Sequence, residues 1–308
     1  MKNSCQSINY HYNTYLYKKT QKGKKEAITG YMFILLPLIG FLFFTAISMG
    51  VSIVYSFTDF NPVRHLDFSE VEFVKFDNYI ALFKDKKFWQ CCFNTVFLML
   101  TLPLGMFIGL LLATYLKNIA KGSKVLRLIY YLPAVSSAVA INIIWRYIFD
   151  MDYGILNVMF GTNVPWLGTS NKWLIRIAIM IKNTWSAVGG TMLLYLAGLN
   201  SISESYYEAA EIDGASPMKQ FFTITIPLIK PTTFYLLITG IIGGLQSYAD
   251  AQVFAQGHTS AQTIVYYIWF YGIDKSKYGL ACAASTLLGI VIMIITFIQF
   301  KKTKMVNI

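Results

Sequence analysis

Two long apolar segments of this chain carry charged side chains that could contact a polar solute. Lys182 lies well within the apolar stretch that ends near Leu199, and Asp250 lies in the stretch that ends near Phe254. Charged groups are costly inside apolar segments, where they line pathways or pair between helices. Four alternatives stay open for Lys182 and Asp250. They could form an ion pair with each other, line a path for the solute, do both, or do neither.

The same two segments hold amide and aromatic groups beside these charges. Trp185 follows Lys182 by three residues, and Gln246 and Tyr248 precede Asp250. Gln246 and Asp250 are four residues apart, so in a continuous helix they would share one face. Amide and carboxylate groups can hydrogen-bond to sugar hydroxyls, and an aromatic ring can stack on a sugar. We therefore take these five residues as the candidate substrate path.

Motifs for nucleotide hydrolysis, metal binding and nucleophilic catalysis are missing from the sequence. It contains no G-x-x-x-x-G-K-[ST], H-E-x-x-H or G-x-S-x-G run. The three histidines are far apart, and the four cysteines form no C-x-x-C pair. We therefore predict no catalytic residue, no metal and no bound cofactor, and we do not expect the chain to be an enzyme.

The composition indicates that the elements positioning these residues are membrane helices. Of the 308 residues, 56% are hydrophobic and 13% are charged, whereas soluble domains carry about 25% charged residues. The net charge of +11 would suggest a nucleic-acid partner for a soluble chain. Here the basic residues lie mostly between the apolar segments, so we expect lipid rather than nucleic acid around the protein.

Six stretches reach the roughly 20 apolar residues that a membrane-spanning helix needs. They are Ile28–Tyr55, Asn94–Leu116, Val125–Phe149, Trp173–Leu199, Thr232–Phe254 and Tyr278–Phe300. The pattern predicts an all-α polytopic membrane protein with an arm at residues 1–27, a transmembrane domain at 28–300 and a tail at 301–308.

The distribution of lysine and arginine orients these spans. Fifteen of the 26 basic residues lie in the N-terminal arm, the second connection, the fourth connection and the tail, whereas eight lie on the other side. Cytoplasmic loops carry the excess of positive charge. Both termini are therefore predicted to be cytoplasmic in a multi-pass protein of the plasma membrane.

The fourth connection, residues 201–231, is predicted to be cytoplasmic and to fold as two short helices joined by a glycine bend. Ser203 or Ser205 could cap the first helix, and Ser205 with Glu208 fits a capping box. Gly214 would end this helix, and Ser216 with Pro217 would begin the second one. Pro227 and Pro231 disfavour continuation before the fifth span begins.

The first of these helices is acidic and rich in small residues. It carries Glu204, Glu208, Glu211 and Asp213 around Ala209 and Ala210. A helix lying on lipid headgroups would instead be basic with bulky apolar residues. The composition favours close docking on another protein, with the lipid-surface helix as the alternative.

This segment resembles the EAA loop of ABC importer permeases. The residues that carry the resemblance are Glu208-Ala209-Ala210, Asp213-Gly214-Ala215, Phe221, Ile224 and Pro227. Three further runs are similar to the sugar-permease branch of the binding-protein-dependent transport inner membrane component family, the maltose and glycerol-3-phosphate type: Phe76–Tyr79, Leu126–Pro133 and Leu194–Leu199.

The resemblance implies a role for the coupling residues. Glu208 would pair with a basic group on a separate ATPase dimer, while Ala209 and Ala210 would allow close helix approach, and Ala215 would belong to the same set of coupling residues. Gly214 would permit the bend, with Asp213 and Pro227 shaping the loop. ATP would be bound by the partner subunit, and a second related permease, an extracytoplasmic solute-binding protein and a small sugar substrate would complete the system.

Two alternatives to this function remain. One is a self-sufficient secondary carrier or channel, although carriers often show internal repeats that this sequence does not display. The other is an ABC permease for a solute other than a sugar.

Overall fold

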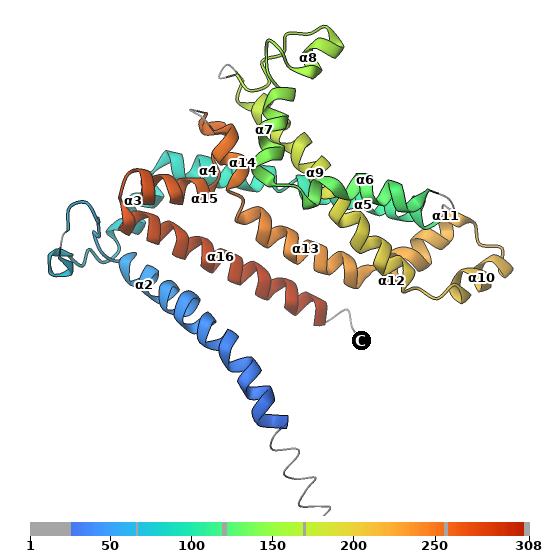
Figure 1. Ribbon diagram of the computed structural model, residues 1–308, viewed down its shortest axis with the longest axis horizontal. Helices are drawn as coiled ribbons and strands as arrows, with labels where there is room; N and C mark the ends of the chain where they lie inside the picture. Colours follow the sequence, from blue (N-terminus) through green and yellow to red (C-terminus); the bar gives the residue numbers. More distant parts are fainter. Residues whose placement is uncertain (1–25, 66, 119–121, 169–170, 256–257, 305–308) are drawn as a thin grey trace, which may run out of the picture. The chain divides into compact units, whose positions relative to one another are not determined.

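The computed structural model describes residues 26–65, 67–118, 122–168, 171–255 and 258–304, which fold almost entirely into helices (Figure 1). Those ranges contain no strand; one isolated bridge pairs Thr58 with Phe73. The chain divides into one unit that ends at Tyr55 and another that begins at Ser56. The predicted all-α class is confirmed, while the arm and tail lie largely outside the described residues.

The first unit is described from Glu26 to Tyr55 as one helix of 30 residues. It includes the π-helical turn η1 (Phe41–Ala46) and α2 (Ile47–Tyr55). Apolar side chains cover all sides of this helix, which is typical of a helix surrounded by lipid or by other membrane helices.

The second unit consists of short and long helices joined by brief connections. In chain order these are η2 (Phe68–Glu70), α3 (Asp77–Lys84), α4 (Lys86–Leu98), α5 (Thr101–Asn118), α6 (Ser123–Val135), α7 (Ala138–Ile148), α8 (Ile155–Phe160), α9 (Lys172–Asn200), α10 (Ser205–Ile212), α11 (Pro217–Gln220), η3 (Phe221–Thr225), α12 (Ile226–Leu228), α13 (Lys230–Leu245), α14 (Ala249–Phe254), η4 (Thr259–Ala261), α15 (Ile264–Trp269), η5 (Phe270–Asp274) and α16 (Tyr278–Lys304).

Among the described residues, three helices are long and apolar enough to cross a membrane, namely Glu26–Tyr55, Lys86–Asn118 and Tyr278–Lys301. Two bent pairs, α6 with α7 and Pro217–Leu228 with Lys230–Phe254, would raise this number to five. The predicted span Trp173–Leu199 lies within α9, whose 29 residues include a polar stretch that begins at Lys182. The polytopic membrane architecture is present, and six spans with cytoplasmic termini stay predictions.

The predicted span Val125–Phe149 is not one straight helix, because the chain bends by 98° between α6 and α7. Ser136 has an extended backbone there, and its amide reaches Pro133 O at 3.4 Å instead of continuing the helix. The Ser136 hydroxyl donates to Leu132 O at 2.8 Å. The side chain thus satisfies a carbonyl that the break leaves without its helical partner.

The predicted continuous span Thr232–Phe254 is also interrupted. α13 ends at Leu245, directly after Gly243 and Gly244, and α14 begins only at Ala249. The carbonyl of Ser247, within the break, accepts a hydrogen bond from the Thr263 hydroxyl at 2.7 Å. A residue distant in sequence therefore supplies the donor that makes this break possible inside an apolar region.

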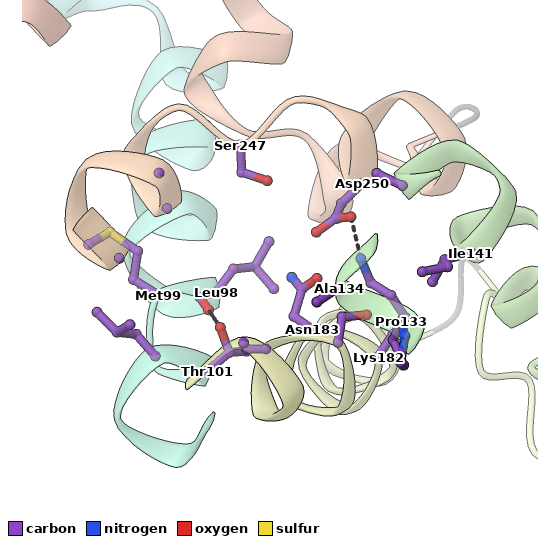
Figure 2. A pocket seen from close by; sticks show the side chains of 18 of the residues that line it. Leu98, Met99, Thr101, Pro133, Ala134, Ile141, Lys182, Asn183, Ser247 and Asp250 are labelled. Carbon is purple, nitrogen blue, oxygen red and sulfur yellow. Dashed lines mark hydrogen bonds and ion pairs between the residues drawn. The ribbon is translucent and has the colours of Figure 1, made fainter. Parts of the chain in front are cut away.

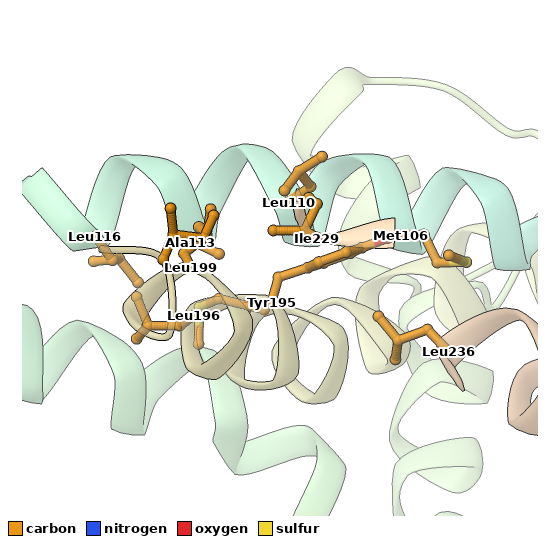
Figure 3. Packing of buried hydrophobic residues seen from close by; sticks show 11 residues of the cluster. Met106, Leu110, Ala113, Leu116, Tyr195, Leu196, Leu199, Ile229 and Leu236 are labelled. Atoms are coloured by element: carbon orange, nitrogen blue, oxygen red, sulfur yellow. The ribbon is translucent and has the colours of Figure 1, made fainter. Parts of the chain in front are cut away.

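The inner core lies where α5 packs along α9, with α6 on the other side of α9. Figure 3 shows Met106, Leu110 and Leu116 of α5 facing Tyr195 and Leu199 of α9. Glycine permits this close approach, since a Cβ on Gly109 would lie 2.2 Å from Thr191 Oγ1. The Thr191 hydroxyl instead donates to Gly105 O across the interface at 3.0 Å.

Candidate functional site

The central candidate site is a cavity of about 560 Å³ between the helices of the second unit (Figure 2). Its lining comes from α4, α5, α6, α7, α9, α13 and α14 and includes the two helix breaks, at Ser136 and Ser247. Non-helical backbone at membrane depth is tolerated where it lines a cavity or is buried in protein. The two breaks that the sequence did not predict therefore open onto the same space.

Three buried polar residues from three helices meet at the edge of this cavity. The Lys182 ammonium group on α9 forms an ion pair with Asp250 Oδ1 on α14, marked by the dashed line between them in Figure 2. Asn142 on α7 donates from Nδ2 to the same oxygen at 3.1 Å. Lys182 is 5% exposed, Asp250 7% and Asn142 0%. Of the alternatives left open for Lys182 and Asp250, the ion pair is present, and a role for the two residues in transport stays a prediction.

Three of the predicted path residues do not line the cavity. Trp185 faces a different, mainly apolar hollow of about 810 Å³ between α5, α6 and α9, and its ring lies 5.5 Å from that of Trp145. Gln246 is exposed, and Tyr248 packs 5.8 Å from the ring of Trp269. The expectation that Gln246 and Asp250 share a helical face is wrong, because α13 ends at Leu245, just before Gln246, and Asp250 belongs to the next helix, α14.

Other polar residues take their place in the lining. Asn142, Asn183, Ser186 and Ser247 contribute amide and hydroxyl groups, and Figure 2 shows Asn183 and Ser247 from different elements around the same space. Asn142 is the one amide in α7, whose other polar residues, Arg146 and Tyr147, lie in the last turn. A polar residue within an apolar span was the sequence signal that could have singled it out.

A second buried cation has a structural role. Arg176 on α9 is 4% exposed and donates to Asn94 Oδ1 from Nε at 3.0 Å and from Nη2 at 2.8 Å. Asn94 in turn donates to the carbonyls of Thr259 and Gln262 at 2.9 and 2.8 Å. This network ties α4 and α9 to the connection before α15.

A second candidate site is the segment that the sequence predicts to be a coupling loop. α10 ends in a Schellman motif at Gly214, whose φ is +69°. The Gly214 amide donates to Glu211 O at 3.0 Å and the Ala215 amide to Ala210 O at 2.9 Å. Ser216 then caps α11 through the Lys219 amide at 3.4 Å, with Pro217 at the helix start. The predicted glycine bend and second cap are confirmed.

Two details of this segment differ from the prediction. The capping box is wrong: α10 has Glu204 at its N-cap without a side-chain cap, and the Ser205 hydroxyl bonds to that of Ser203 at 2.8 Å. The helix also continues one residue beyond Pro227, to Leu228, and the break that Pro227 and Pro231 predict lies at Ile229, between the two prolines, where the chain bends by 60°. A π-helical turn, η3, ends at Thr225, two residues before Pro227, and provides the wider turn in which the missing amide and bulky ring fit.

Polar contacts attach α10 to the membrane core. Lys117, at the end of α5, lies 3.0 Å from the Glu204 carboxylate and 4.8 Å above the ring of Tyr207. The Tyr207 hydroxyl bonds to that of Thr225 at 3.0 Å. Tyr207 also packs on the inner core. These contacts join α10 to α5 and η3.

The opposite side of α10 is exposed. Glu208, Ala209 and Asp213 are exposed, and Ile212 is 87% exposed. In the next helix Met218 is 67% exposed. Acidic, small and large apolar residues thus share one accessible segment, whose other side is attached to α5 and η3.

Comparison with known proteins identifies the family. Residues 105–302 match the model of the binding-protein-dependent transport system inner membrane component. The chain belongs to this family and is a multi-pass component of the cell membrane.

Individual relatives agree along most of the chain. A probable ABC transporter permease protein, YesP of Bacillus subtilis, is 32% identical over 294 residues, which cover 92% of this chain and 93% of YesP. The lactose transport system permease protein LacF of Rhizobium radiobacter is 32% identical over 235 residues, covering 72% and 78% of the two chains. A chain in the structure of a bacterial alginate ABC transporter, solved with its alginate pentasaccharide-bound periplasmic protein, is 26% identical with a TM-score of 0.77 and covers 90% of this chain and 94% of that chain.

Proposed function

We propose that this chain is a translocation subunit of an ATP-driven, binding-protein-dependent importer for a sugar or oligosaccharide. The observation that carries the proposal is the segment from α10 to α12, which exposes acidic and apolar side chains on one side and is bonded to α5 and the core on the other. The family membership of the chain supports the same role.

In this proposal α10 is the coupling helix. Glu208 pairs with a basic group of a separate ATPase subunit, and Ala209, Ala210 and Ala215 allow close approach of its surface. Gly214 holds the bend, with Asp213 and Pro227 on either side of it in the loop. Closure of the ATPase dimer then moves α10, and Lys117 and Tyr207 pass the movement to α5 and η3.

The proposal includes several partners. A dimer of ATPase subunits binds ATP, so the chain itself carries no cofactor and catalyses no reaction. A second, related permease completes the path, and an extracytoplasmic binding protein delivers the solute. The alginate transporter solved with a periplasmic protein supports the last of these partners.

A sugar is the solute that the cavity and the relatives support best. The lining combines amide and hydroxyl groups with apolar surface, as suits a ligand with hydroxyls and apolar ring faces. LacF is a lactose transport permease and the solved neighbour is an alginate transporter.

Affinity purification of the chain from its native membrane in mild detergent, followed by reconstitution, tests this function. We expect an ATPase and a second permease to co-purify in fixed proportion. With the binding protein added, the proteoliposomes should then import a sugar only when ATP is supplied. A pure single chain that transports in liposomes without ATP would overturn the proposal in favour of a secondary carrier.

A further inference from the structure

The charges on the cavity lining cancel each other. Among the described residues that line the cavity, Lys182 and Asp250 are the ionisable ones, and they are paired with each other. The ammonium group of Lys182 is therefore directed at a carboxylate rather than held free for a solute. The lining from this chain offers a solute amides, hydroxyls and apolar surface, with no net charge.

The ion pair also fixes the orientation of Asn142. Its amide nitrogen donates to Asp250 Oδ1 at 3.1 Å, and the reverse orientation would place the amide oxygen against a carboxylate. Asn142 Oδ1 is thus the atom left over. It is buried, and no described residue donates to it.

A second group of the cavity lining also has a buried polar atom without a hydrogen-bond partner among the described residues. Ser186 Oγ, on α9 one turn beyond Lys182, is buried and has no hydrogen-bond partner among the described residues. Buried polar atoms of folded proteins nearly always find partners, and those of a binding site find them in the ligand. Asn142 and Ser186 both line the cavity, so a ligand there could satisfy both atoms.

We propose that Asn142 is a specificity-determining residue of the path, and that its Oδ1 accepts a hydrogen bond from a hydroxyl of a neutral, polyhydroxylated solute. The inference rests on the proposed function. A hydroxyl can donate to Asn142 Oδ1, whereas a carboxylate or phosphate ester that is ionised at neutral pH offers only acceptors at its charged group. Such an anion would also meet the Asp250 carboxylate without a free cation to offset it. The cavity lining therefore favours neutral sugars over uronates and sugar phosphates.

The first test needs no variant. The binding protein that co-purifies with the complex is screened against neutral oligosaccharides, uronate oligosaccharides and sugar phosphates, and the bound solute is offered to the wild-type complex in proteoliposomes. We expect ATP-dependent import of a neutral sugar. Import of an anionic sugar would overturn the inference while leaving the proposed function intact, and no ATP-dependent import of any solute would overturn both.

The second test asks whether Asn142 itself contacts a hydroxyl. A set of single-deoxy analogues that the binding protein still binds is offered to the wild type and to Asn142→Leu. The matched control is Asn163→Leu, which is exposed in the segment between α7 and α9, called the outer loop because the charge distribution predicts that it lies outside the cell. Loss of one hydrogen bond predicts that the wild type imports one analogue about 3- to 10-fold more slowly than the parent sugar. In Asn142→Leu this difference should disappear, whereas Asn163→Leu should keep it.

A purely structural role for Asn142 gives a different result. Asn142→Leu would then slow the import of every sugar alike and keep the penalty for the same deoxy analogue, which would overturn the contact. If Asn142→Leu does not assemble, Ser186→Ala serves the same purpose, because it removes the neighbouring unpartnered hydroxyl with little change in volume. The proposal would be contradicted in full by two results together: Ser186→Ala imports every analogue at the wild-type rate, and the wild type imports an anionic solute.

Discussion

The coupling segment and the cavity are both polar sites on an apolar framework, but they are built differently. In the coupling segment neighbouring residues set the geometry: Gly214 ends α10, and Ser216 begins α11. In the cavity the geometry depends on contacts between distant residues, such as Thr263 with Ser247 and Lys182 with Asp250. A single substitution should therefore disable the coupling segment. In the cavity, the effect of one substitution should be offset by a second substitution in the partner residue.

Gly214→Val should have the largest effect. A β-branched residue is strongly disfavoured at the φ of +69° found there, so we expect the Schellman motif to be lost and ATP-driven uptake to fall to background. The measurement is sugar uptake by the reconstituted complex, with membrane insertion checked separately.

Gly161→Val is the matched control, because Gly161 has a φ of +62° in the outer loop after α8 and has space for a Cβ. It carries the same backbone cost away from the coupling segment, and uptake should remain at half of the wild-type rate or more. Equal loss in both variants would show that folding, rather than coupling, explains the result for Gly214.

Glu208→Lys should lower uptake by about tenfold or more, because it places a positive charge against the basic group proposed on the ATPase and reverses a favourable pair into a repulsive one. The same reversal at Asp152, which is exposed in the outer loop, serves as the control. The ATP hydrolysis rate of the complex and its subunit composition on gel filtration are the readouts. Normal uptake by Glu208→Lys would contradict the docking role.

Asp250→Asn should destabilise the chain by about 3–5 kcal/mol, since it leaves the Lys182 ammonium group buried without its partner. Lys182→Met should have a similar effect. The double variant should recover most of the loss in a thermal unfolding assay in detergent, because no buried charge remains. Losses that simply add in the double variant would show that the two residues do not act as a pair.

Tyr207→Phe should have the smallest effect, about 0.5–1.5 kcal/mol, because it removes one hydrogen bond to Thr225 and keeps the packed ring. Tyr206→Phe, at the exposed neighbouring position, should change neither stability nor uptake. Thermal unfolding of the two variants, run side by side, measures the difference. Identical unfolding temperatures for the two variants would show that the Tyr207 hydroxyl does not help to attach α10.

Local chemistry explains why the coupling segment was largely predictable. A glycine at a helix end and a serine before a proline determine their turns within a few residues, and both turns form as the sequence indicates. The start of α10 was not predicted correctly, because the Glu204 carboxylate bonds to Lys117 from a different helix. A tertiary contact, rather than a local capping box, accompanies that helix start.

The cavity was less predictable for a related reason. Periodicity and hydropathy are the same for a continuous span and for one broken at Ser136 or Ser247, because the break depends on a side chain that supplies the missing hydrogen bond. The depth of Lys182 and Asp250 along their segments made their pairing one of the open alternatives, and the structure shows the pair. Because the helix ends at Leu245, the neighbours Gln246 and Tyr248 lie elsewhere.

Site-specific photo-crosslinking tests the central claim most directly. A photoreactive amino acid is placed at Ile212 on α10, which is 87% exposed, and at the control position Tyr153 in the outer loop, which is 85% exposed. The complex is illuminated in native membranes with and without ATP, and the captured chains are identified by mass spectrometry. The account predicts capture of an ATPase subunit from position 212, with a yield that changes with ATP, and none from position 153. Capture of lipid alone at position 212 would contradict it and favour the lipid-surface helix.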